Sequence, residues 1–215
     1  MIHITRSLFF IAAISAAAAC TDTREKTSLE NTSLVNTPLE NTPLENTSLI
    51  EFQSHLHGLC GMVVKGQVTS TDPQDEDWRK EVLTLGPISC PNAVTTVLPL
   101  AVGPDKSRVW TLTLQDKGQS LDFRHAHSLK DGSPDPVTGY GGVAMADNST
   151  ATRAVFPVDE VSKAIFAEND LKPSMTNTWS ISITPTRKME YKLSREGRNF
   201  VAEFDLSSFD LILSE

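Results

Sequence analysis

Apolar and polar side chains alternate along most of residues 52–215, in short runs separated by Gly, Pro, Asn and Asp. A period of two places the apolar side chains on one face of a β-strand and the polar ones on the other. Three runs near the C-terminus show the pattern most clearly, and Glu196-Gly197 predicts a tight hairpin turn between the last two. Their apolar positions are Trp179, Ile181 and Ile183; Met189, Tyr191 and Leu193; and Phe200, Ala202, Phe204 and Leu206.

Only two stretches of this region have helical spacing. One covers residues 51–59, and the other begins near Asp159, which we expect to be its N-cap, with Val161 and Ile165 on the inner face. Many short strands with one polar face indicate an antiparallel sheet that turns its apolar face inwards. Since a closed barrel removes exposed sheet edges, we predict a mainly β fold, a single antiparallel β-barrel or strongly curved sheet. A two-sheet β-sandwich is the alternative.

The most informative strand covers residues 120–128 and contains two of the five histidines of the chain. Read as a strand, it places His125 and His127 on the same face as its apolar residues. Imidazole is a good ligand for Zn, Cu or Ni, so the pair could bind a divalent transition metal with Asp131 or Asp135 as an oxygen ligand. The alternative, which we favour, is two histidines at the rim of the sheet, hydrogen-bonded to neighbouring groups.

The first 19 residues have the parts of a secretory signal peptide. A short start with Arg6 precedes an uncharged apolar run that is too short to span a bilayer and ends in Ala17-Ala18-Ala19. Cys20 follows directly, as in the bacterial lipobox, where the cysteine is lipidated. Ala17 stands where the lipobox usually has Leu, so ordinary signal peptidase is the alternative. We expect export and a lipid anchor at Cys20 in the outer membrane, with the protein facing the periplasm or the cell surface.

Residues 20–51 are predicted to be a tether. Within them a five-residue repeat places a leucine at every fifth position, a spacing that forms neither a helical stripe nor one face of a strand. Proline in two of the copies weakens both structures. The alternative is a pentapeptide-repeat β-helix, but five copies make little more than one coil. We therefore divide the chain into a signal peptide (1–19), a lipidated tether (20–51) and one β-rich domain (52–215).

Charge and cysteine content narrow the range of partners. The formal charge is −8. Removal of residues 1–19 takes away one positive charge, that of Arg6, and makes it −9. An acidic protein without a basic run is not expected to bind nucleic acid. In an oxidising compartment the remaining cysteines, Cys60 and Cys90, favour a disulfide over two buried thiols.

Four segments within residues 56–206 carry a family resemblance. They are Ser107-Arg108-Val109-Trp110, Arg124-His125-Ala126-His127 with Asp131-Gly132-Ser133, Tyr140-Gly141-Gly142, and Arg198-Asn199-Phe200-Val201-Ala202-Glu203-Phe204-Asp205-Leu206. Together they resemble an uncharacterised family of bacterial secreted proteins and lipoproteins, and the likeness covers most of residues 56–206. In that family the histidine segment has an Asp and a further His where this chain has Ala126 and Leu129. The family has no assigned activity, so the resemblance implies an exported domain and no chemistry.

A weaker likeness concerns the order of the elements. An early helix, a glycine-bearing strand after it and Arg198 on the last long strand are faintly similar to the lipocalin or calycin pattern. The tryptophan expected in the first strand of that pattern is absent. The analogy therefore implies a barrel and no more.

These patterns lead to three functional hypotheses. The first is a non-catalytic binding module that holds a small ligand or partner in the curved sheet, with Arg108, His125, His127 and Tyr140 at the site. Arg108 would clamp an anionic group, or alternatively pair with a nearby Asp; Tyr140-Gly141-Gly142 would allow close backbone approach. The second is a metal-assisted hydrolase or isomerase that uses His125, His127 and Asp131. The third is a structural envelope protein. We find no motif of a common catalytic class.

Overall fold

The computed structural model describes residues 47–211, with the side chains of residues 47–209. The predicted signal peptide, Cys20 and the tether up to residue 46 lie outside this range. The helices are α1 (Ser48–His57), α2 (Glu76–Arg79) and α3 (Glu160–Glu168), with short 3-10 turns η1 (Pro73–Asp75), η2 (Asp116–Gly118), η3 (Ala146–Asn148) and η4 (Lys172–Thr176). The strands are β1 (Met62–Val68), β2 (Leu83–Leu85), β3 (Ser89–Asn92), β4 (Thr95–Val102), β5 (Asp105–Gln115), β6 (Ser120–His127), β7 (Tyr140–Met145), β8 (Arg153–Pro157), β9 (Thr178–Thr184), β10 (Lys188–Arg195), β11 (Arg198–Asp205) and β12 (Asp210–Leu211).

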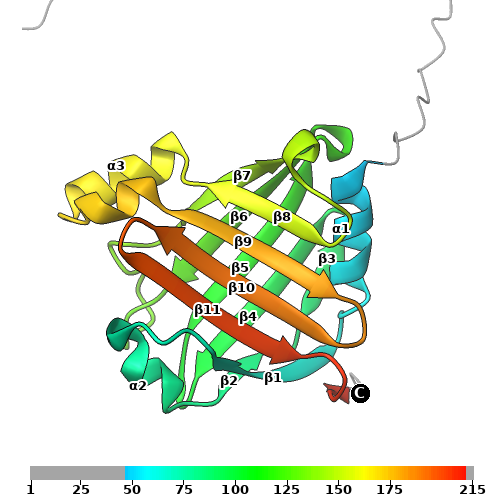
Figure 1. Cartoon of the computed structure of the whole chain (residues 1–215), viewed down its shortest axis with the longest axis horizontal. Helices are drawn as coiled ribbons and strands as arrows, with labels where there is room; N and C mark the ends of the chain where they lie inside the picture. The colour runs from blue at the N-terminus through cyan, green and yellow to red at the C-terminus, as the bar shows by residue number, and fades with distance from the viewer. Residues whose placement is uncertain (1–46, 212–215) are drawn as a thin grey trace, which may run out of the picture. The chain divides into compact units, whose positions relative to one another are not determined.

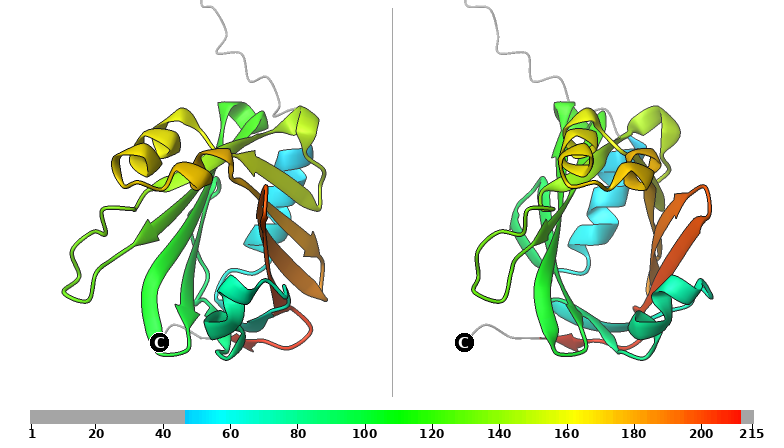
Figure 2. Two further views of the ribbon diagram at one scale, coloured as in Figure 1. Left: turned by 60° about the vertical axis from the view of Figure 1, so that its left-hand side comes forward. Right: turned by 90° about the vertical axis from the view of Figure 1, so that its left-hand side faces the viewer.

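Ten of these strands form one antiparallel sheet that curves into a nearly closed barrel (Figures 1 and 2). The order is β7-β6-β5-β4-β2-β1-β11-β10-β9-β8, while β3 pairs with β4 and β12 pairs with β1 outside this path. The strands at the two ends of the path, β7 and β8, meet at an isolated bridge between Gly142 and Val158. The prediction of a barrel or strongly curved sheet is confirmed, and the sandwich alternative is not adopted.

Two adjacent glycines allow the barrel to close at this seam. A Cβ atom on Gly142 would lie 2.1 Å from the carbonyl oxygen of Pro157 in β8, and one on Gly141 would lie 1.7 Å from the carbonyl oxygen of Phe123 in β6. No side chain fits at either position. Helix α3 secures the seam, because the Ser162 hydroxyl accepts from the Gly141 N–H at 2.7 Å and lies 3.0 Å from the Gly141 carbonyl. The expected close backbone approach at Tyr140-Gly141-Gly142 is thus present.

Helix α1 closes one end of the barrel, and the right-hand view of Figure 2 shows it at the far end of the ring of strands. It begins at Ser48, with the Thr47 side chain accepting from the Ile50 N–H as N-cap. Leu49, Phe52 and Leu56 are fully buried. The boundary predicted at residue 51 was therefore wrong, because the last leucine of the repeat packs into the barrel core.

Helix α3 begins where the sequence indicated, with a different face turned inwards. Asp159 is its N-cap and accepts from the Ser162 N–H at 2.8 Å. Ser162 and Phe166 are the buried positions, whereas Val161 is 63 % exposed. The predicted inner face of Val161 and Ile165 was wrong, because the hydrogen bonds of Ser162 to the seam set the rotation of the helix.

Two further segments bear on the predictions. Cys60 and Cys90 form a disulfide with a Cα–Cα distance of 5.9 Å, the pairing that the sequence favoured. Residues 71–80, a stretch rich in acidic side chains, contain η1 and α2. Within residues 47–211, no helix has the length and apolar character needed to span a membrane.

Candidate functional site

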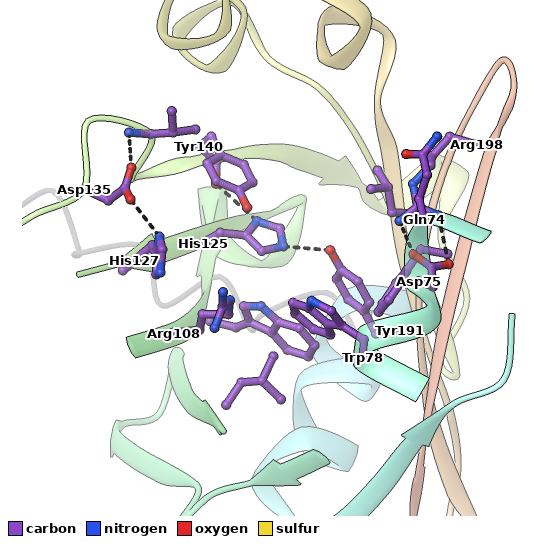
Figure 3. Close-up of a pocket in the computed structure, with 16 residues that line it drawn as sticks. Gln74, Asp75, Trp78, Arg108, His125, His127, Asp135, Tyr140, Tyr191 and Arg198 are labelled. Carbon is purple, nitrogen blue, oxygen red and sulfur yellow. Dashed lines mark hydrogen bonds and ion pairs between the residues drawn. The ribbon is translucent and has the colours of Figure 1, made fainter. Parts of the chain in front are cut away.

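A cavity of about 510 Å³ opens at the end of the barrel that faces away from α1 (Figure 3). Its walls are aromatic and aliphatic side chains of six strands, and η1 and α2 form part of its rim. The lining includes the rings and apolar side chains of Trp78, Trp110, His125, Tyr140, Tyr191, Leu193 and Phe200, and the charged and polar side chains of Asp75, Arg108, His127, Asp135 and Arg198. Five residues proposed from the sequence thus line the cavity: Arg108, His125, His127, Asp135 and Tyr140.

Two stacked pairs of rings form the inner wall of the cavity. The indole of Trp110 stacks on the Tyr191 ring with centroids 4.4 Å apart, and the imidazole of His125 stacks on the Tyr140 ring at 4.7 Å. Strand register explains the grouping, because His125 lies opposite Trp110 on one side and opposite Tyr140 on the other. Cross-strand neighbours on one face of a sheet are close enough for their rings to touch. The result is a continuous aromatic surface facing the cavity.

His125 is a buried, neutral and fully hydrogen-bonded side chain. Its Nδ1 lies 3.3 Å from the Tyr140 carbonyl oxygen and its Nε2 lies 3.0 Å from the Tyr191 hydroxyl. Because a carbonyl can only accept, Nδ1 carries the proton and Nε2 accepts from the hydroxyl. Burial, with a smaller contribution from nearby Arg124, lowers the pKa of His125 from 6.5 to about 3. Neither ring nitrogen is free for a metal ion.

His127, two residues further along β6, has a different environment at the mouth. Its Nδ1 lies 3.0 Å from Oδ2 of Asp135, and the two side chains are 31 % and 19 % exposed. The other carboxylate oxygen of Asp135 accepts from the Val137 N–H at 2.7 Å. In the neutral imidazole with Nδ1 donating to Asp135, Nε2 of His127 is an acceptor. Within the described residues, neither this nitrogen nor the Tyr140 hydroxyl has a hydrogen-bond partner, so both are available to a ligand.

Arg108 forms one side of the mouth. It pairs with Asp105, and its guanidinium lies 5.1 Å from the centre of the Trp78 ring. The ring of Trp78 in turn meets Phe200 edge-on at 5.4 Å. Hydrogen bonds from Ser107 and Arg108 hold the pKa of the Asp105 carboxyl well below its usual range. The sequence left two interpretations of Arg108 open, a clamp for an anionic ligand and an ion pair with a nearby Asp. The structure shows the ion pair.

Arg198 forms the opposite side of the mouth and fixes η1 in place. It donates to Oδ2 of Asp72 at 3.0 Å and to Oδ2 of Asp75 at 2.9 Å. Asp75 is only 2 % exposed and also accepts from the Ser70 hydroxyl at 2.8 Å. Figure 3 shows this pair across the cavity from His127 and Asp135. A buried carboxylate needs such partners.

Sequence reasoning missed the contributions of Asp75 and Trp78. Both lie in the acidic stretch of residues 71–80, where no periodic pattern indicates a contact with the barrel. The one available signal was an indole in a segment that is otherwise charged, because large aromatic side chains seldom remain free in solvent.

The metal set predicted from the sequence is not assembled. Asp131 lies in an exposed turn, where its carboxylate accepts from the Ser133 N–H at 3.0 Å and from the Ser133 hydroxyl at 2.6 Å. It does not line the cavity. No group of three or more His, Cys, Asp or Glu in the described part of the chain could hold a metal ion. The predicted metal set of His125, His127 and Asp131 was therefore wrong. The Asp131 carboxylate is bound within its own turn, and both ring nitrogens of His125 are bound to other groups.

Comparisons with protein-family models, with curated proteins and with solved structures give no match. The resemblance to bacterial secreted proteins stays a prediction.

Proposed function

We propose that this protein is a binding module that holds a small, flat organic ligand in the barrel. The observation that carries the proposal is the cavity of about 510 Å³ with aromatic walls. Cavities of about 300–1,000 Å³ with largely apolar walls and a few polar groups are typical of small-molecule sites. A flat ring would stack on the aromatic wall and displace water from it.

The polar groups of the cavity support binding better than metal-assisted catalysis. His125 uses both ring nitrogens in bonds to Tyr140 and Tyr191, so its function is to fix the aromatic wall. His127 and Tyr140 offer one acceptor nitrogen and one hydroxyl to a bound molecule. Two such groups can orient a ligand, as in other small-molecule sites.

A variant that fills the cavity tests the proposal. Leu193 lines the cavity and is partly buried, so Leu193→Trp places an indole in the space that a ligand would occupy. Leu171→Trp is the matched control, because Leu171 is 38 % exposed and does not line the cavity. Naphthylethanol is titrated into each protein and the heat of binding is measured.

We expect the wild type and Leu171→Trp to bind the probe, and Leu193→Trp to bind at least tenfold more weakly, a difference of about 1.4 kcal/mol. Circular dichroism and thermal unfolding verify that both variants are folded. Equal binding by Leu193→Trp and the wild type would place the probe outside the cavity and contradict the proposal. Absence of binding to the wild type would favour the structural envelope protein instead.

We also propose that the protein is exported and anchored in the bacterial envelope by a lipid on Cys20. The signal-like residues 1–19 and the Cys60–Cys90 disulfide support this, since disulfides persist in oxidising compartments. Labelling with radioactive palmitate in a bacterial host tests the anchor. We expect label on the wild type and none on Cys20→Ser; equal labelling of both would contradict it.

A further inference from the structure

Both guanidinium groups that line the cavity are already neutralised by carboxylates. Arg108 pairs with Asp105 at one side of the mouth. Arg198 pairs with Asp72 and Asp75 at the other side. A ligand carboxylate entering the cavity would therefore meet no cation with an uncompensated charge.

The carboxylates of the lining are hydrogen-bonded, but their negative charge is not fully compensated, because the one cation of Arg198 faces both Asp72 and Asp75. Asp75 accepts from Arg198 and from the Ser70 hydroxyl. Asp135 accepts from the Val137 N–H and interacts with His127. The groups that remain available within residues 47–211 are uncharged: the Tyr140 hydroxyl and, with Nδ1 donating to Asp135, the Nε2 acceptor of His127.

We propose that the cavity excludes anionic ligands and that Asp105 sets this selectivity by neutralising Arg108. The inference rests on the proposed function and names its ligand class: a flat ring compound that carries no negative charge. Transfer of an ion from water into a largely apolar cavity is costly unless a countercharge is free to receive it. A neutral hydroxyl loses less hydration and can bond to the groups at Tyr140 and His127.

Asp105 is well placed to control the charge of Arg108 without contacting the ligand. It lies at the start of β5, three residues before Arg108, and its side chain is 46 % exposed. It does not line the cavity. Removal of the Asp105 carboxylate would leave the Arg108 guanidinium at the mouth with free N–H donors. Such a group recognises carboxylates. One substitution should therefore convert a site for neutral ligands into one that accepts anions.

Three probes with the same ring and different charge test this inference: naphthylethanol, naphthylethylamine and naphthylacetate. For the wild type we expect the alcohol to bind at least tenfold more tightly than naphthylacetate by calorimetry, about 1.4 kcal/mol. In Asp105→Asn we expect the affinity for naphthylacetate to rise about tenfold, and that for the alcohol to change by less than about twofold. The gain should decrease at high salt, because screening weakens the new charge pair.

Two variants make the result specific. Asp147→Asn is the matched control for net charge, because Asp147 is exposed in η3 and does not line the cavity, and it should bind all three probes as the wild type does. The double variant Asp105→Asn/Arg108→Gln should lose the gain for naphthylacetate, since Arg108 is its source. Thermal unfolding of each variant verifies the fold.

The outcomes separate this inference from the proposed function. If the wild type binds naphthylacetate as tightly as the alcohol, the cavity is a ligand site and the selectivity is wrong. An unchanged affinity of folded Asp105→Asn for naphthylacetate would overturn the role of Asp105. Absence of binding of all three probes to the wild type would overturn the proposed function itself.

Discussion

The two ends of the barrel differ in the interactions that hold them, apolar packing at one end and ion pairs around a cavity at the other. At the end closed by α1, Leu49, Phe52 and Leu56 are fully buried. A disulfide joins Cys60, just after this helix, to Cys90 in β3. At the open end, Trp78 and Arg108 face a cavity, and ion pairs hold the rim. Apolar packing excludes water from one end, whereas the other remains accessible.

The difference separates stability from binding. A fully buried apolar side chain contributes about 1.5–3 kcal/mol by leaving water, and exposed ion pairs typically contribute less than about 1 kcal/mol each. The closed end should therefore supply most of the stability of this barrel. The open end can then leave aromatic surface uncovered for a ligand.

The histidines of β6 show the same contrast two residues apart. His125 is 5 % exposed and serves the packing of the aromatic wall. His127, at the mouth, is bound to Asp135 through one nitrogen. Distance along the strand, and therefore depth in the barrel, decides which imidazole is structural.

The largest expected effect comes from truncating one ring at each end. Phe52→Ala should lower the free energy of unfolding by about 3–5 kcal/mol, because it leaves a cavity in close-packed surroundings. Phe200→Ala should cost at least about 1 kcal/mol less, because Phe200 lines a cavity that already exists. Urea denaturation of the two variants measures both losses. Equal losses would show that the open end is as tightly packed as the closed one.

An intermediate effect is expected from pH. The folded pKa of His125, about 3, lies below its ordinary value of 6.5, so between these values the unfolded chain binds more protons than the folded one. Stability is then fully present above about pH 6.5 and decreases by up to about 1.4 kcal/mol per pH unit as the pH falls towards 3. Between pH 7 and pH 5 the wild type should lose about 2 kcal/mol from this group.

The variant His125→Gln isolates this contribution, because the amide is neutral throughout and can retain a hydrogen bond. All other side chains are the same in the two proteins, so their contributions cancel in the difference. Urea denaturation at the two pH values gives the comparison. A variant that loses as much stability on acidification as the wild type would show that His125 is not the group responsible.

The smallest effect on stability is expected at the rim. Trp78→Ala removes the Arg108 contact and the edge contact with Phe200, each worth about 0.5–1.5 kcal/mol. We expect the Tm to fall by only a few degrees, which corresponds to a loss of about 1–2 kcal/mol in the free energy of unfolding. Naphthylethanol should dissociate faster from this variant in stopped-flow measurements. A loss of stability as large as that of Phe52→Ala would contradict the division between the two ends.

The strands were predictable because each depends on its own alternation. Trp179, Ile181 and Ile183 share the face that the period of two requires, and β10 and β11 meet at the expected Glu196-Gly197 turn. The Asp159 cap was also predictable, since capping is a local interaction. These features need only neighbours in the sequence.

The candidate site was only partly predictable. The shared face of β6 indicated His125 and His127, and the register of β5 and β7 then placed Arg108 and Tyr140 beside them. Asp75 is joined to Arg198 over a separation of 123 residues, and no local pattern encodes that contact. The metal hypothesis failed for a similar reason, because hydrogen bonds from other elements engage His125.

The sequence by itself determined the strands, their inward faces, the hairpins and the helix cap, because these follow from the order of side chains along a short segment. Only the tertiary structure decided which end of the barrel is closed, which histidine is buried and which cations are neutralised. Those properties depend on desolvation and on charges brought together from distant segments, and neither exists until the sheet has curved.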